Sequence, residues 1–191
     1  ELQAIRPFSS ECKSLMEAIR SLGRKYPPAT TALAGLRDSA VAQRQAQPDR
    51  RELVQEIAVL NDHLGEGYRT LALYDSLPPD HIDRPFLAMV ANSSFIEARR
   101  YADALVGKPF PLMLSLIESG PRQIETWDAS RQARMRESIV TGTLTNIEVL
   151  TGAGKTDEAR LLTERLLVFD NTEDTRYRLK QYRDRAQAPR P

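Results

Sequence analysis

The sequence is poor in the side chains that build metal sites and disulfide frameworks. It has one cysteine, Cys12, and two histidines among 191 residues. A single cysteine cannot form an internal disulfide, and neither histidine has a cysteine or a second histidine at the short spacings of zinc sites. These scarcities exclude a disulfide-stabilised fold and a recognisable metal site, so we expect no metal and no cofactor.

Long apolar runs and an excess of one charge are also absent. No segment approaches the roughly 18 apolar residues that a membrane helix needs, so we expect no membrane insertion. Lys and Arg number 27 against 26 Asp and Glu, a formal net charge of +1. Such a balance creates no long-range field, and nucleic acid is therefore not an expected partner unless a local patch recruits it.

The compartment stays open on this sequence. The chain begins at Glu1 rather than at Met, which is compatible with a removed signal peptide or with another domain upstream. We therefore expect a soluble protein of either the cytoplasm or the periplasm and extracellular space.

Strand patterns are scarce as well. No segment shows sustained two-residue alternation rich in Val, Ile and Thr, whereas apolar residues recur at spacings of three and four throughout. The stripe of Leu53, Ile57, Leu60 and Leu64 is one example. The sequence therefore predicts an all-α protein.

Prolines and glycines divide this helical pattern into antiparallel hairpins, which we expect to form a single domain at 1–188. The predicted parts are an N-terminal hairpin at 9–46, hairpins at 49–78, 83–108 and 129–170, a capping helix at 171–187 and a loose tail at 188–191. Asn92–Ser94 is the predicted turn of the 83–108 hairpin. Gly120 with Pro121 is predicted to be a corner after a short apolar helix.

Three segments combine small residues with leucines. They are Gly154, Lys155, Thr156, Asp157, Glu158, Ala159, Leu162, Leu166, Leu167 and Asp170; Glu97, Ala98, Tyr101, Ala104, Leu105 and Pro109; and Gly67, Tyr68, Leu71, Tyr74 and Pro78. Each resembles the second half of a tetratricopeptide repeat. The resemblance covers residues 50–110 and 138–172, and the spacing of its Glu-Ala units is not a multiple of the family's period of about 34 residues.

The resemblance implies an irregular superhelix of stacked hairpins with a groove for an extended peptide or a helix. Placed by the best-matching segment, Thr141, Leu144, Thr145 and Glu148 are expected to face that groove. Trp127 is a further candidate, because interface aromatics often anchor partners. The alternative for all five is ordinary helix surface and core.

A local basic cluster lies near the C-terminus. It comprises Arg176, Arg178, Lys180, Arg183 and Arg185, with Tyr177 and Tyr182 interleaved. Such a cluster can contact phosphates. However, acidic residues interrupt it, and a terminal repeat needs a polar outer face. We therefore favour a solvated capping helix and keep nucleic-acid binding as a weaker alternative.

No set of residues forms a coherent catalytic motif. Gly152–Thr156 contains the glycines, lysine and hydroxyl of a phosphate-binding loop, but Val149 stands where the first glycine is required. We interpret it as a turn between helices. Surface or structural roles are expected for His63 and His81, for the carboxylate pairs Asp62 with Glu66 and Asp157 with Glu158, and for Cys12.

The sequence favours binding over catalysis. We expect a non-catalytic scaffold that holds a peptide segment or a partner subunit in a groove between stacked helices, and its pattern is compatible with a homo-oligomer. The alternative is an accessory or regulatory part of a larger enzyme or signalling protein. The weaker alternative is nucleic-acid binding through the basic C-terminal helix.

Overall fold

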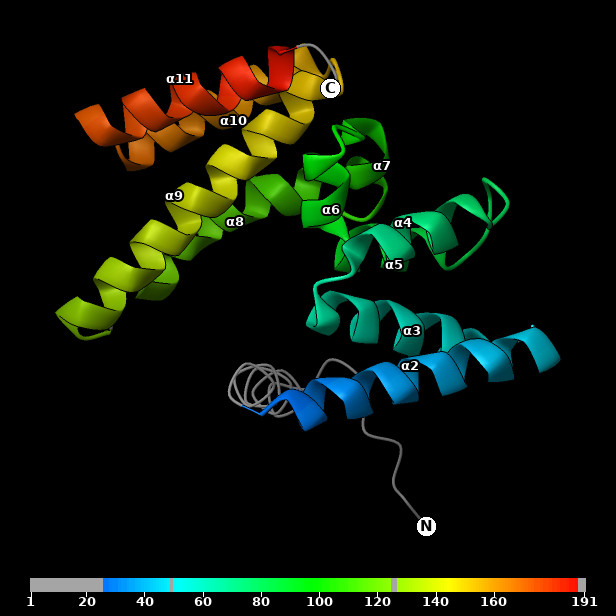
Figure 1. Cartoon of the computed structure of the whole chain (residues 1–191). Coiled ribbons are helices and arrows are strands. Elements are labelled where there is room, and N and C mark those ends of the chain that lie inside the picture. Colours follow the sequence, from blue (N-terminus) through cyan, green and yellow to red (C-terminus); the bar gives the residue numbers. More distant parts are fainter. Residues whose placement is uncertain (1–25, 49, 125–126, 189–191) are drawn as a thin grey trace. The chain divides into compact units, whose positions relative to one another are not determined.

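The computed structural model describes residues 26–48, 50–124 and 127–188, without the side chains of 121–124. Within these ranges it contains ten helices and no strand, so the predicted all-α class is confirmed (Figure 1). The helices are α2 Pro27–Ala46, α3 Arg51–Leu64, α4 Gly67–Asp75, α5 Arg84–Val90, α6 Asn92–Glu97, α7 Tyr101–Val106, α8 Phe110–Ile124, α9 Ala129–Gly152, α10 Thr156–Phe169 and α11 Glu173–Gln187. None of the helices described is long and apolar enough to cross a membrane.

Some sequence predictions lie outside the described residues. These are the first helix of the 9–46 hairpin, Cys12, and most of the tail at 188–191. The second helix of that hairpin is α2, which begins where Pro27 and Pro28 occupy the first turn. Proline suits this position because its fixed φ matches a helix and its missing N–H has no partner there.

The chain divides into two compact units, with the boundary between Ala91 and Asn92. This boundary falls inside the predicted 83–108 hairpin. The turn expected at Asn92–Ser94 is wrong, because helix α6 begins at Asn92. Phe95 is completely buried within α6. Burial of such a side chain outweighs the weak preference of Asn and Ser for turns.

In the first unit, α3 packs against α2, α4 and α5. Its stripe of Leu53 and Ile57 is buried together with Ala40 of α2. Helix α3 ends at Leu64 and is capped by Gly65, whose φ of 72° lies in the left-handed region that glycine adopts without strain. The chain turns there into α4, so α3 contacts α2 as well as α4.

In the second unit, α9 is the central helix and packs against α7, α8, α10 and α11. Asp128 caps its N-terminus, where the Asp128 carboxylate accepts a hydrogen bond from the Arg131 N–H at 3.0 Å. Along its C-terminal half, Leu144, Ile147 and Leu150 are completely buried. Full burial of such side chains stabilises a fold by about 2 kcal/mol each.

The corner predicted at Gly120 and Pro121 is wrong, because α8 runs through both positions to Ile124. A Cβ added to Gly120 would lie 2.6 Å from Cδ1 of Ile139 in α9. The glycine therefore lies in the contact between two helices, where a methyl group would displace the end of the Ile139 side chain, and not in a turn. Sequence alone does not distinguish these two uses of glycine.

Candidate functional site

The groove residues predicted on α9 lie largely inside the second unit. Leu144 is fully buried and Glu148 is only 4% exposed. Thr141 and Thr145 are half-buried, and Thr145 donates its hydroxyl hydrogen bond back to the Thr141 carbonyl within the helix. This face of α9 is therefore covered by another part of the chain.

The covering element is α11, which carries the basic cluster. Arg178 donates to the Thr141 hydroxyl at 2.6 Å and forms an ion pair with Glu137 at 2.9 Å. Arg185 forms an ion pair with Glu148 at 2.9 Å. The structure thus brings the predicted groove residues and the predicted basic cluster into contact with each other, so α11 occupies this face.

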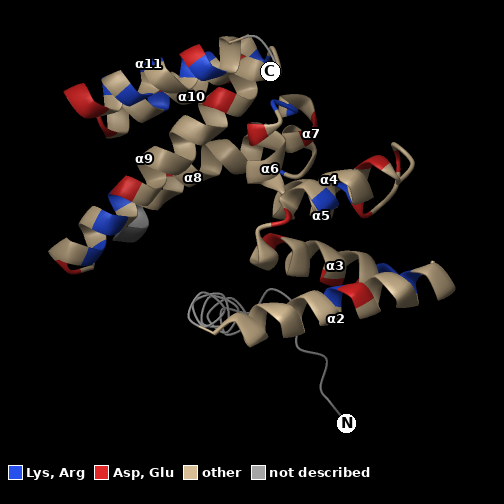
Figure 2. Ribbon diagram, in the orientation of Figure 1, with Lys and Arg blue, Asp and Glu red and all other residues tan. Residues whose placement is uncertain are grey.

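The other members of the basic cluster differ in their surroundings. Arg183 donates to the Thr163 hydroxyl at 2.9 Å, which ties α11 to α10. Arg176 donates to Asn171 just before the helix, and Lys180 is exposed. Acidic and basic side chains are mixed along α11 (Figure 2). The cluster therefore serves largely to dock α11 onto its neighbours.

The buried carboxylate of Glu148 links α9 to α7 and to α11. The carboxylate of Glu148 accepts from the Tyr101 hydroxyl at 3.3 Å and from Arg185 at 2.9 Å. Burial raises the pKa of the Tyr101 phenol, and the nearby Glu148 charge and their hydrogen bond raise it further. The hydrogen bond to Glu148 likewise raises the pKa of Arg185. Both shifts stabilise the protonated forms of Tyr101 and Arg185, and the two contacts with Glu148 tie α7 and α11 to α9.

Trp127 lies apart from these contacts, just before α9 begins. Its ring is half-buried, with the Arg131 guanidinium 4.1 Å from the ring centroid. Trp127 precedes Thr141 by 14 positions, nearly all of them helical, which corresponds to about 20 Å along the axis. The structure therefore does not bring Trp127 together with the other predicted binding residues.

His81 and Asp157, two of the positions singled out in the sequence, have partners in the structure. His81 accepts a hydrogen bond from the Asp83 N–H at 3.2 Å, and the buried Asp83 carboxylate accepts from Arg51 at 2.7 Å. Asp157 lies 3.8 Å from Arg160 in an exposed pair. In the described part of the chain, no three His, Cys, Asp or Glu side chains gather to hold a metal ion.

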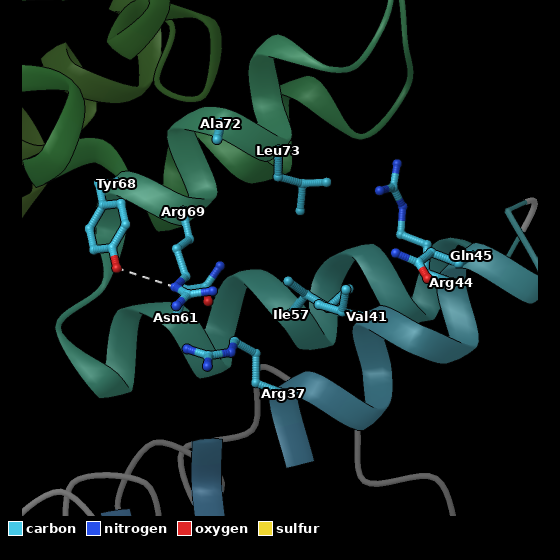
Figure 3. Close-up of a pocket in the computed structure, with 10 residues that line it drawn as sticks. All are labelled: Arg37, Val41, Arg44, Gln45, Ile57, Asn61, Tyr68, Arg69, Ala72 and Leu73. Atoms are coloured by element: carbon cyan, nitrogen blue, oxygen red, sulfur yellow. Dashed lines mark hydrogen bonds between the residues drawn. The ribbon is translucent and has the colours of Figure 1, made fainter. Parts of the chain in front are cut away.

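A different site, which sequence reasoning missed, is a pocket between α2, α3 and α4 in the first unit. It has a cavity of about 360 Å³ and is drawn in Figure 3. Helix α2 contributes Arg37, Val41, Arg44 and Gln45; α3 contributes Ile57 and Asn61; α4 contributes Tyr68, Arg69, Ala72 and Leu73. We call this pocket the arginine groove. Cavities of roughly 300 to 1,000 Å³ are typical of ligand sites.

The sequence carries one signal for the arginine groove. Arg37, Val41 and Arg44 stand at successive spacings of four and three residues, which places them on one face of a helix. A helix face that only packs against a hydrophobic core rarely carries two arginines on either side of a valine. The sequence does not reveal which helix lies opposite, and the pocket depends on α3 and α4.

The arginine groove has an apolar middle and polar ends. Figure 3 shows Leu73 reaching from α4 toward Val41 and Ile57, with Arg44 at one end of this apolar floor and Arg69 near the other. Val41 is 38% exposed, which is high for a valine on a packed face. The floor therefore offers apolar surface that a ligand could cover.

Arg37 and Arg69 share one carboxylate at their end of the groove. Arg37 is 5% exposed and hydrogen-bonds to Glu66, and it also pairs with the exposed Asp38 at 2.8 Å. Arg69 pairs with Glu66 at 2.7 Å and donates to the Tyr68 hydroxyl at 3.3 Å. Glu66 thus holds both guanidinium groups in place and neutralises part of their charge.

Two buried polar atoms of the groove have no hydrogen-bond partner among the described residues. One is Nε of Arg44 and the other is Oδ1 of Asn61. Asn61 is 1% exposed, and its Nδ2 donates to the Thr70 hydroxyl at 3.2 Å. A buried donor or acceptor without a partner costs about 1 to 3 kcal/mol, so this pair favours a ligand that offers both an acceptor and a donor.

Comparison with known proteins identifies no relative: no family model, no curated protein sequence and no solved structure matches this chain. Conclusions about function therefore depend on the chemistry of the arginine groove.

Proposed function

We propose that this chain is a non-catalytic interaction module, and that its arginine groove binds an extended peptide segment of a partner protein. The observation that carries the proposal is a pair of buried atoms, Asn61 Oδ1 and Arg44 Nε, that have no partner in the described ranges and lie beside an open apolar floor. A peptide backbone offers an N–H and a C=O at each residue, which are the groups that these two atoms lack.

The side chains of the groove favour binding over chemistry. Its polar members are arginine, asparagine, glutamine and tyrosine. Arginine stays protonated, and amides neither gain nor lose protons near neutral pH, so these groups serve as fixed hydrogen-bond donors and acceptors. General acid or base catalysis needs a group that titrates near the working pH.

The tetratricopeptide resemblance supports the same proposal. One of the segments that carry it begins at Gly67 and Tyr68, and Tyr68 lines the groove. The resemblance implies stacked hairpins whose inner faces bind extended peptides. We propose that α3 and α4, which lie within the range of the resemblance, form one such irregular hairpin, with α2 packed against α3.

The other roles expected from the sequence fit the structure less directly. Arg178, Arg183 and Arg185 make contacts within the second unit, which leaves fewer cations of the basic cluster for nucleic acid. A role as the accessory part of a larger protein is compatible with peptide binding and stays a prediction.

The test is a selection from a displayed library of random heptapeptides against the whole chain. We expect a convergent set of peptides whose binding, measured by fluorescence polarisation, is lost in Ala72→Trp. This exposed alanine lines the groove, and an indole there would fill it. The matched control is Ala42→Trp, which adds the same side chain at an exposed helical position outside the lining.

Two results would contradict the proposal. One is a selection that returns no convergent peptide although the protein is folded by circular dichroism. The other is a set of peptides that bind Ala72→Trp as well as they bind the unmodified chain.

A further inference from the structure

Resting on the proposed function, we infer that the arginine groove is selective for acidic peptides: it takes an extended segment in which a carboxylate side chain stands two residues from an aliphatic one. The carboxylate lies at Arg44, the aliphatic side chain lies on the floor of Val41, Ile57 and Leu73, and the backbone contacts Asn61.

The position of the carboxylate follows from Arg44. Its guanidinium has a planar set of donors, and its buried Nε has no partner among the described residues. Guanidinium and carboxylate groups match in shape and can form two parallel hydrogen bonds, which are roughly twice as strong as neutral ones. A carboxylate is therefore the side-chain group that best accepts hydrogen bonds from the Arg44 guanidinium.

The position of the aliphatic side chain follows from the floor beside Arg44. Val41 precedes Arg44 by three residues on α2, so the two positions are about 4.5 Å apart along the helix axis. In an extended peptide, side chains two residues apart point to the same face and are separated by about 6.7 Å. The length of the arginine side chain accommodates the difference, so both peptide side chains can be seated at once.

The backbone contact follows from Asn61. Its Oδ1 is an acceptor without a partner in the described structure, while its Nδ2 is held by Thr70. Because the Thr70 hydroxyl accepts from Nδ2, the amide is oriented with its oxygen free for a donor. A peptide N–H supplies that donor without requiring a particular side chain.

Glu66 limits the acidity that the groove tolerates at its other end. It binds both Arg37 and Arg69, so a second ligand carboxylate would have to compete with it. Removing this charge in Glu66→Gln leaves Arg69 without its carboxylate partner and Arg37 paired with Asp38 alone, so the positive charge at this end of the groove rises. We therefore expect Glu66→Gln to bind an acidic peptide about threefold more tightly or better, a gain in function that general damage would not produce.

The experiment uses the peptides selected from the random heptapeptide library, with both peptide ends blocked so that only side-chain carboxylates are present. We expect Asp or Glu to be enriched two positions from Leu, Ile or Val. Replacing that acid by its amide should weaken binding about tenfold or more, since a charged hydrogen-bonded pair is lost.

The protein variants separate this inference from general loss of binding. Arg44→Gln should lose the preference for the acidic peptide over its amide, whereas Arg50→Gln should keep it. Arg50 is an exposed arginine before α3 that does not line the groove. A higher salt concentration should weaken the binding of the acidic peptide more than the binding of its amide analogue.

Each outcome decides between the proposals. Convergent peptides without an acid preference overturn the inference and leave peptide binding in the groove standing, whereas no convergent peptide overturns both. An unchanged acid preference in Arg44→Gln also overturns the inference. So does a single-stranded RNA oligonucleotide that displaces every selected peptide and depends on Arg44, because the occupant would then be nucleic acid.

Discussion

The ring of Tyr101 lies directly against the backbone of Gly152. A Cβ built on Gly152 would lie 2.1 Å from Cδ2 and 2.6 Å from Cγ of that ring. Tyr101 is itself buried and its hydroxyl is bonded to Glu148, so the ring cannot swing away without losing that bond. The end of α9 and the start of α7 therefore depend on the absence of a side chain at residue 152.

Gly152→Ala should destabilise the second unit. The added methyl group overlaps a buried ring, and such overpacking costs about 1 to 3 kcal/mol. The measurement is the free energy of unfolding in urea. Gly142→Ala is the matched control on the same helix, because its Cβ would meet the nearest atom, of Leu116, at 3.4 Å and alanine favours helix. Equal stability of Gly152→Ala and Gly142→Ala would show that the Tyr101 ring does not pack so closely against Gly152.

Arg185→Gln should destabilise the packing of α11 on α9. It leaves the carboxylate of Glu148 buried without its cation, while the Arg185 side chain is half-exposed and its loss is partly compensated by water. We expect a cost of about 1 to 3 kcal/mol in the free energy of unfolding, below that of breaking a fully buried pair. The double variant Glu148→Gln with Arg185→Gln should recover part of this loss. A double variant as unstable as the sum of both single variants would show that the two residues do not interact.

Arg99 has a φ of 53° at the end of α6, in the left-handed region that usually belongs to glycine. The Arg100 N–H bonds to the Phe95 carbonyl at 2.8 Å and the Arg99 N–H to Ile96 at 2.9 Å, which closes the helix. Arg99→Gly should therefore be more stable than Arg99→Val by about 1 to 2 kcal/mol or more, although both lose the arginine side chain. At Ala133, an exposed position within α9, the same two substitutions should show the reverse order, with valine preferred over glycine. Equal stability of the two Arg99 variants would refute the strained turn.

Stability should fall at high pH partly through Tyr101. Burial, reinforced by Glu148, raises the pKa of its phenol above the ordinary value of 10.0. The folded state thus holds this proton more tightly than the unfolded state, so the contribution is complete below pH 10.0 and is lost as pH rises above it. The urea midpoint should fall more between about pH 9 and about pH 11 in the unmodified chain than in Tyr101→Phe. An equal fall in both would rule out this linkage.

The local helical pattern could be derived from the sequence because it depends on neighbours along the chain. Apolar spacing predicts the stripe of Leu53 and Ile57, and the proline pair at Pro27 and Pro28 marks the start of α2. The sequence predicts a turn between helices at Gly152–Thr156. Gly154, with a φ of 74°, forms this turn between α9 and α10. In each case a short stretch of chain contains the whole physical cause.

The contacts between helices were decided only in three dimensions. The sequence predicts a corner at Gly120, but in the structure Ile139 packs against this glycine. The sequence predicts that Glu148 faces a groove, but Arg185 of α11 covers it. The arginine groove likewise needs Asn61 and Leu73 to lie opposite α2, from segments that no spacing rule connects to it. Periodicity states which face of a helix is apolar, but the choice of the facing helix depends on packing energies summed over the whole unit.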